Sequence, residues 1–108
     1  MSKVPPGAWR VEIRESGRSG SVDYHEGTDS LSFHWEFGGG DTVASIWIGE
    51  SSEWNARLPW AAGRREAILA RIAEEVVRQR APTCSALIEE PPGFISIRQR
   101  PGHRARTQ

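Results

Sequence analysis

The sequence predicts a two-layer α+β domain, in which an antiparallel sheet of four to six strands packs against one long helix in the order ββββ-α-ββ. The first half of the chain alternates apolar and polar residues over short segments, which is typical of strands with one buried face. A later segment repeats apolar residues at three- and four-residue spacing, which is typical of a helix with one buried stripe. Strands grouped before and after a single helix favour an antiparallel sheet covered on one face.

Four strands are expected before the helix. Residues 9–14, 22–24 and 31–37 alternate apolar and polar side chains, whereas residues 43–48 are apolar on both faces and therefore predict an interior strand. Glycine-containing turns separate these segments. The apolar residues of the first three segments are Trp9, Val11, Ile13, Val22, Tyr24, Leu31, Phe33, Trp35 and Phe37.

The long helix is expected over about residues 61–80, because Pro59 stands where a helix can begin and Ala81-Pro82 ends the periodic segment. Two short strands, residues 85–89 and 94–98, follow it. The predicted buried stripe of the helix consists of Ile68, Leu69, Ile72, Ala73, Val76 and Val77.

The chain has 108 residues and a mass of 12.0 kDa, which is the size of one domain. We expect a flexible arm over residues 1–8, a single domain over 9–98 and a basic, disordered tail over 99–108. No window approaches about 18 consecutive apolar residues, so a spanning helix is not expected. The first residues lack the apolar segment of a secretory signal, which favours a cytoplasmic protein.

The composition is unusual in tryptophan and arginine. The chain contains 5 tryptophans, and 13 of its 14 basic residues are arginine. Enrichment in both is typical of protein interfaces, although a GC-rich genome also raises arginine content. The net charge is zero but unevenly placed, at −4 over residues 1–60 and +4 over 61–108.

No catalytic pattern is present in the sequence. There is no Gly-x-Ser-x-Gly motif, and Cys84 follows a helix end, where the helix dipole disfavours a thiolate. The glycines of 38–40 precede a strand rather than a helix, so they predict a turn and not a phosphate loop. The sequence therefore favours a protein without enzymatic activity and without a cofactor.

Nucleic-acid binding is disfavoured. Its basis would be the four arginines of the last 11 residues, which could contact phosphates. The sequence pI of about 6.8 lacks the basic footprint of a dedicated nucleic-acid-binding domain.

His25 and His34 are weak candidates for metal ligands. They flank one turn on the polar side of neighbouring strands, so the pair could face each other with Asp23 and Glu36 nearby. No HExxH or His-x-His spacing supports the site. The same region offers contacts for a small molecule, namely Tyr24, His25, His34 and Trp35, with a pocket of several hundred Å³ expected between sheet and helix.

A candidate protein-binding segment precedes and opens the helix. Its residues are Trp54, Arg57, Trp60, Arg64 and Arg65. Two arginines at a helix start meet the positive end of the helix dipole, so they require either local carboxylates (Glu50, Glu53 or Glu66) or an anionic partner. The tryptophans either stack on the guanidinium groups at an interface or close the end of the core.

Together these features favour a non-catalytic cytoplasmic protein-binding domain, such as an inhibitor, an immunity-type partner or an adaptor. Its partner would be another protein or a second copy of the chain. The strand–helix–strand order is similar to that of small bacterial α+β proteins, some immunity proteins of toxin systems among them. The alternative is a small-molecule- or metal-binding domain that uses the polar sheet face or the sheet–helix pocket.

Overall fold

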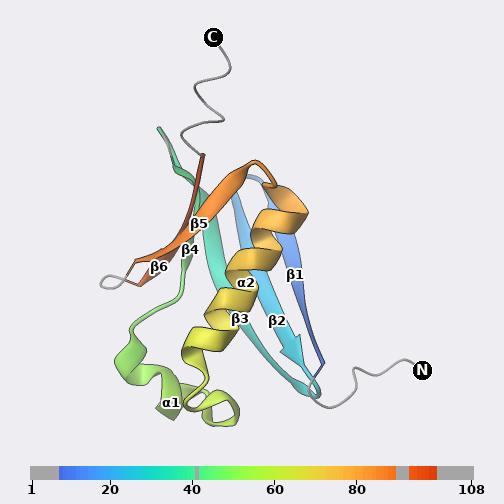
Figure 1. Cartoon of the computed structure of the whole chain (residues 1–108), viewed down its shortest axis with the longest axis vertical. Helices are drawn as coiled ribbons and strands as arrows, with labels where there is room; N and C mark the ends of the chain where they lie inside the picture. Colours follow the sequence, from blue (N-terminus) through green and yellow to red (C-terminus); the bar gives the residue numbers. More distant parts are fainter. Residues whose placement is uncertain (1–7, 41, 90–92, 100–108) are drawn as a thin grey trace, which may run out of the picture.

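The computed structural model describes residues 8–40, 42–89 and 93–99, and it confirms the predicted two-layer α+β class (Figure 1). Its strands are β1 (Trp9–Ser16), β2 (Ser19–Glu26), β3 (Asp29–Phe37), β4 (Thr42–Trp47), β5 (Cys84–Glu89) and β6 (Phe94–Gln99). Its helices are α1 (Trp54–Arg57) and α2 (Arg65–Arg80), with 3₁₀ turns at Ser51–Glu53 and Pro59–Ala61. None of these helices has the length and apolarity needed to cross a membrane.

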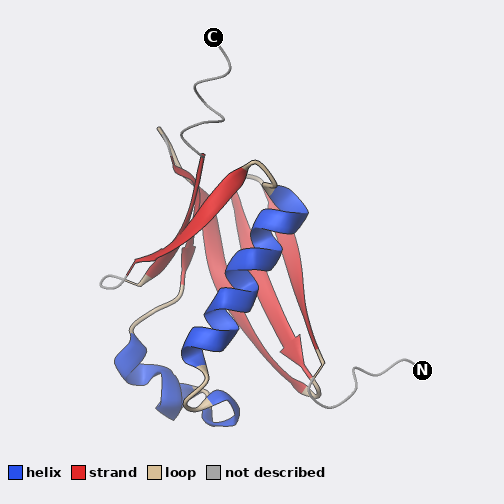
Figure 2. Cartoon of the chain, in the orientation of Figure 1, coloured by secondary structure: helices blue, strands red, loops and turns tan. Residues whose placement is uncertain are grey.

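The strands form a single antiparallel sheet in the order β1-β2-β3-β4-β6-β5, and α2 lies across one face of it (Figure 2). We call this the helix face and the other side the open face. Because β6 lies between β4 and β5, β4 is an interior strand, as the sequence predicts. The two edges of the sheet are β1 and β5, which the sequence does not identify.

Two tight hairpins fix the register of the first three strands. The turns at Gly17 and Gly27 each join strands through two residues, and both glycines have positive φ, 67° and 62°. Such turns require this backbone conformation. The resulting register places Val11, Tyr24 and Leu31 side by side on the helix face.

The core fills the space between the helix face and α2. Of the predicted helix stripe, Val77 is half-buried and the other residues are buried. The helix begins at Arg65 and not near residue 61, because Pro59–Ala61 forms a 3₁₀ turn and Gly63 takes a φ of 75°. The buried apolar residues are Val11, Val22, Tyr24, Leu31, Trp35, Ile46, Ile48, Trp54, Ala61, Ile68, Leu69, Ile72, Ala73, Val76, Cys84, Ile95 and Ile97.

The two edge strands of the sheet, β1 and β5, differ in how far other residues cover them. At β1, side chains of α2 bond to main-chain carbonyls, with Gln79 donating to Val11 O at 3.0 Å and Arg80 to Ile13 O at 3.3 Å. At β5, Leu87 and Ile88 are 51% and 39% exposed. The β5 edge is therefore the more accessible one for another strand.

The predicted terminal segments fall almost wholly outside the described residues. Of the arm over residues 1–8 only Ala8 is described, and of the tail over 99–108 only Gln99, which is the last residue of β6. The arginines at 100, 104 and 106 lie outside the described part, whereas Arg98 belongs to β6.

Candidate functional site

Arg64, one of the predicted interface residues, binds a carboxylate of its own chain. Its Nη2 atom lies 2.8 Å from both carboxylate oxygens of Glu26, which also accepts a hydrogen bond of 2.7 Å from the Tyr24 hydroxyl. Arg71 donates to that hydroxyl at 2.6 Å. The expectation that Glu50, Glu53 or Glu66 would pair with Arg64 is wrong: its partner comes from β2, 38 residues earlier.

This cluster keeps Glu26 ionised. Burial by itself raises the pKa of the Glu26 carboxyl, but hydrogen bonds from Arg64 and Tyr24 and the charge of Arg71 outweigh burial, so its pKa lies below the usual 4.5. An arginine at the start of α2 is repelled by the positive end of the helix dipole. The Glu26 carboxylate beside Arg64 offsets this repulsion.

Aromatic rings pack against the cluster. Tyr24 stacks between Trp9 and Trp60, with ring centroids 6.1 and 6.4 Å away, and the Arg71 guanidinium lies 5.2 Å from the Trp9 ring. Tyr24 is fully buried. The sequence predicts Tyr24 as a ligand contact, but in the structure its ring lies in the core and its hydroxyl is hydrogen-bonded to Glu26 and Arg71.

The rest of the predicted protein-binding segment closes one end of the core. Trp54 is only 4% exposed, and its indole nitrogen donates to Ala61 O at 2.8 Å. Arg65 lies over the Trp54 ring at 5.7 Å and donates to Gly49 O at 3.0 Å. Arg57 remains exposed, 3.9 Å from Glu53. Trp54 therefore closes the end of the core, which is the second of the two sequence interpretations, and Arg65 stacks on its ring from outside.

The two histidines do not face each other, contrary to expectation. In the β2–β3 register His34 lies opposite Ser21, while His25 lies opposite Ser30 near the other end of the hairpin. His34 contacts Glu36 at 3.1 Å on the same strand. The two histidines lie at unequal distances from the turn at Gly27 and Thr28, with His25 two residues before it and His34 six residues after it, so the register cannot pair them.

His25 instead gathers with two carboxylates on the open face. One ligand atom each from Glu12, Asp23 and His25 lies within 4.8 Å of the others. Arg14 already bonds Asp23 at 2.9 Å and lies 3.4 Å from Glu12. A cation would meet this guanidinium, so we assign no metal to the cluster.

Trp47 is the exposed tryptophan. It lies on β4 and is 49% exposed on the open face, where its ring meets Phe94 of β6 edge to face at 4.4 Å and 70°. The other four tryptophans belong to or pack against the helix-side core. Sequence reasoning did not single out Trp47, because the segment apolar on both faces predicted burial on both.

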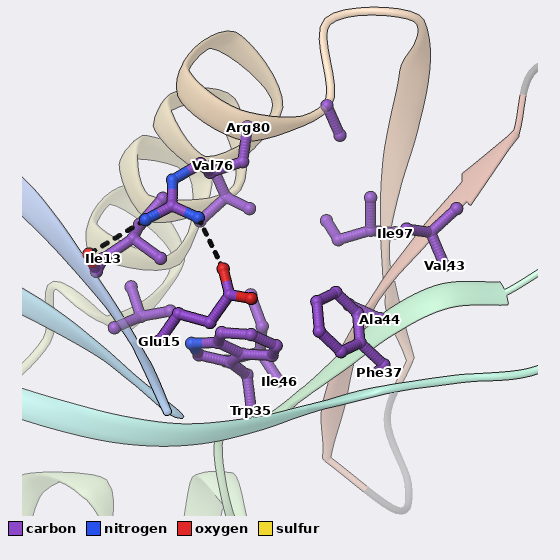
Figure 3. A pocket seen from close by; sticks show the side chains of 12 residues that line it. Ile13, Glu15, Trp35, Phe37, Val43, Ala44, Ile46, Val76, Arg80 and Ile97 are labelled. Atoms are coloured by element: carbon purple, nitrogen blue, oxygen red, sulfur yellow. Dashed lines mark hydrogen bonds and ion pairs between the residues drawn. The ribbon is translucent and has the colours of Figure 1, made fainter. Parts of the chain in front are cut away.

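A second feature is an apolar hollow of about 240 Å³ between the sheet and the last turn of α2 (Figure 3). It lies between sheet and helix, where the sequence predicts a pocket. Of the four candidate ligand contacts Trp35 lines it, whereas Tyr24, His25 and His34 do not. The Glu15–Arg80 ion pair lies at its edge, with a distance of 3.0 Å. The lining residues are Ile13, Glu15, Val22, Trp35, Phe37, Val43, Ala44, Ile46, Val76, Arg80, Ala81 and Ile97.

Comparisons with protein family models, curated proteins and solved structures give no match to this chain.

Proposed function

We propose that this chain is a non-catalytic protein-binding domain that docks its partner on the open face of the sheet, around Trp47. The observation that supports it most is the half-exposed indole on an interior strand, on the face that α2 does not cover. An exposed tryptophan held by a neighbouring ring offers a large, rigid contact area, and such residues dominate binding energy at interfaces.

The surroundings of Trp47 resemble an interface in their arrangement. We call Trp47, Phe94 and Leu87 the open-face patch; the strand register places all three on the same side of β4, β6 and β5. Polar groups surround the patch: His34 lies directly opposite Trp47 on β3, and Arg98 lies 3.6 Å from Glu89. Aromatic rings bordered by polar groups favour a protein partner, which would be the target of an inhibitor or a component of the complex that an adaptor joins.

The proposal is tested by photo-crosslinking in the source cells. A photoreactive phenylalanine analogue is placed at position 47 and, as a matched control, at position 67 on the exposed side of α2. We expect a discrete protein adduct at position 47 only, and we expect Arg98→Glu in the rim to weaken it. Equal adduct formation at both positions, or none at position 47, would contradict the proposal.

A second copy of the chain is the other candidate partner, and the β5 edge favours it. Ile88 is exposed there beside α2, while the β1 edge is bonded by Gln79 and Arg80. Two β5 strands pairing antiparallel would extend the sheet and keep both α2 helices on one side. Sedimentation should then show a dimer for the native chain and a monomer for Ile88→Lys, whereas a native monomer excludes this partner.

A further inference from the structure

We propose that the hollow at the end of α2 binds a small aryl carboxylate, with its ring in the apolar space and its carboxylate on Arg80 in place of Glu15. This site lies on the helix face and is independent of the open-face patch and of the function proposed for it. The inference depends on three properties of the hollow: a fixed aromatic wall, one exchangeable ion pair and a limited volume.

Trp35 forms a wall of the hollow that is held in position (Figure 3). Its indole nitrogen donates to Arg14 O at 3.1 Å across β2, and Gly20, which lies opposite Trp35, leaves the space for the ring to cross. A Cβ atom at Gly20 would lie 2.9 Å from the indole nitrogen. Phe37 meets Trp35 edge to face at 4.9 Å and 77°. A third aromatic ring in the hollow could contact the Trp35 or Phe37 ring edge to face, and such contacts are favourable.

The only charged groups lining the hollow, among the described residues, are Glu15 and Arg80. Arg80 is held at two points, by its bond to Ile13 O at 3.3 Å and by Glu15 at 3.0 Å. The Glu15 carboxylate has Arg80 as its partner among the described residues. Glu15 is thus the group that can leave, while the guanidinium stays in position.

Replacing the Glu15 carboxylate by that of a ligand at Arg80 costs little free energy. The Glu15 and Arg80 side chains are 42% and 45% exposed, and ion pairs at such positions contribute little to stability. A guanidinium binds carboxylates through a planar fork of donors, which fits an incoming carboxylate as well as it fits Glu15. An anion, rather than a cation on Glu15, is favoured because only Arg80 has a second anchor.

The volume limits the size of the ligand. An apolar cavity of about 150 Å³ holds benzene, and pockets for drug-sized molecules begin near 300 Å³. A hollow of about 240 Å³ therefore fits one aromatic ring with a short chain. With the carboxylate at the edge and the ring inside, a molecule such as 3-phenylpropionate has the required length and polarity.

The test is a titration of the full chain followed by NMR, with 3-phenylpropionate as the probe. We expect saturable shifts at the Trp35 indole N–H, with the Trp47 indole N–H on the other face as an unmoved internal control. The neutral analogue 3-phenylpropionamide should bind at least about fivefold more weakly, since a charge-assisted bond is lost. Octanoate distinguishes an aliphatic from an aromatic preference, and we expect it to bind more weakly than the aryl probe.

Two variants separate the roles of the ion pair. Arg80→Gln should weaken binding of 3-phenylpropionate by about tenfold or more, because the carboxylate loses its cation. Glu15→Gln should strengthen it by up to about fivefold, because the competing carboxylate is gone. Glu12→Gln, on the same strand but the opposite face, is the matched control and should change nothing.

Three results would overturn the inference. Equal affinity for the acid and the amide would mean that Arg80 does not recognise the ligand. Tighter binding of 3-phenylpropylamine than of the acid would assign the contact to Glu15 and a cation. Absence of any shift at the Trp35 indole with all probes at millimolar concentration would mean that the hollow admits none of them.

Discussion

Arg64 and Glu26 form an ion pair between the two layers of the structure, with one guanidinium nitrogen 2.8 Å from each carboxylate oxygen. The Glu26 side chain is only 14% exposed. It joins the end of β2 to the start of α2, and it places a carboxylate beside the helix end where cations are otherwise unfavourable. This pair therefore fixes where the helix begins relative to the sheet.

The first prediction concerns the loss of this carboxylate. Glu26→Gln should lower the free energy of unfolding by about 2 kcal/mol or more, because Arg64 and Arg71 lose their partner in a partly buried position. Urea denaturation measures the change. Glu53→Gln is the matched control, since its contact with Arg57 is 3.9 Å long and exposed, and it should change stability by less than about 0.5 kcal/mol.

The pH dependence of the free energy of unfolding is a second measure of the Arg64–Glu26 ion pair. Because the pKa of Glu26 is lowered in the folded state, its stabilising contribution is complete above 4.5 and is lost as the pH falls below that value. The native chain should therefore lose stability in acid more steeply than Glu26→Gln does. Parallel acid limbs for the two proteins would contradict the assignment.

The strands and the helix could be predicted because each depends on a local pattern. The alternation around Leu31 and Trp35 and the stripe through Ile68 and Ile72 need only the neighbouring residues. The pair of Glu26 with Arg64 could not be predicted, since it depends on which strand end meets the start of the helix. That relationship follows from strand order, which local periodicity does not contain.

The candidate sites show the same limit. Trp35 is one of the four ligand contacts that the sequence predicts, and it is the one that lines the hollow between sheet and helix. Glu15 and Arg80 are 65 residues apart and meet only because β1 is the edge beside the end of α2. Trp47 was missed because an apolar segment does not reveal which of its faces the single helix leaves open.

The next prediction concerns the acidity of a helix-surface glutamate. Hydrogen bonds from Arg78, at 2.8 and 3.0 Å, and from Gln79 lower the pKa of Glu75 from 4.5 to about 2. A carboxyl carbon NMR titration should therefore show a midpoint near 2, and Arg78→Gln should raise it toward 4.5. Arg10→Gln, on β1, is the control and should leave the midpoint unchanged.

The lowered pKa of Glu75 also predicts how the free energy of unfolding depends on pH. A lowered folded-state pKa means that the contribution of Glu75 is complete above 4.5 and is lost between 4.5 and about 2. A midpoint for Glu75 near 4.5 in the native chain would show that the ion pair does not form in solution.

A third prediction concerns the glycine beneath Trp35. Gly20→Ala should destabilise the fold by about 2 kcal/mol or more, because the added Cβ overlaps the carbonyl oxygen of Arg14 and crowds the indole nitrogen. Gly39→Ala is the matched control: a Cβ there meets nothing within 4 Å, so the change should be within about 0.5 kcal/mol. Equal denaturation midpoints for the two variants would contradict the close approach of Arg14 O and the Trp35 indole to Gly20.

The last prediction tests the exposure on which the proposed function depends. Trp47 is 49% exposed, whereas Trp35 and Trp54 are 5% and 4% exposed. Acrylamide should therefore quench Trp47 most efficiently, and Trp47→Phe should remove the most quenchable and most red-shifted part of the emission. Trp9→Phe should leave that part in place, since the Trp9 ring stacks on Tyr24. If Trp47→Phe leaves the quenching curve unchanged, the indole is covered in solution and is not available to a protein partner.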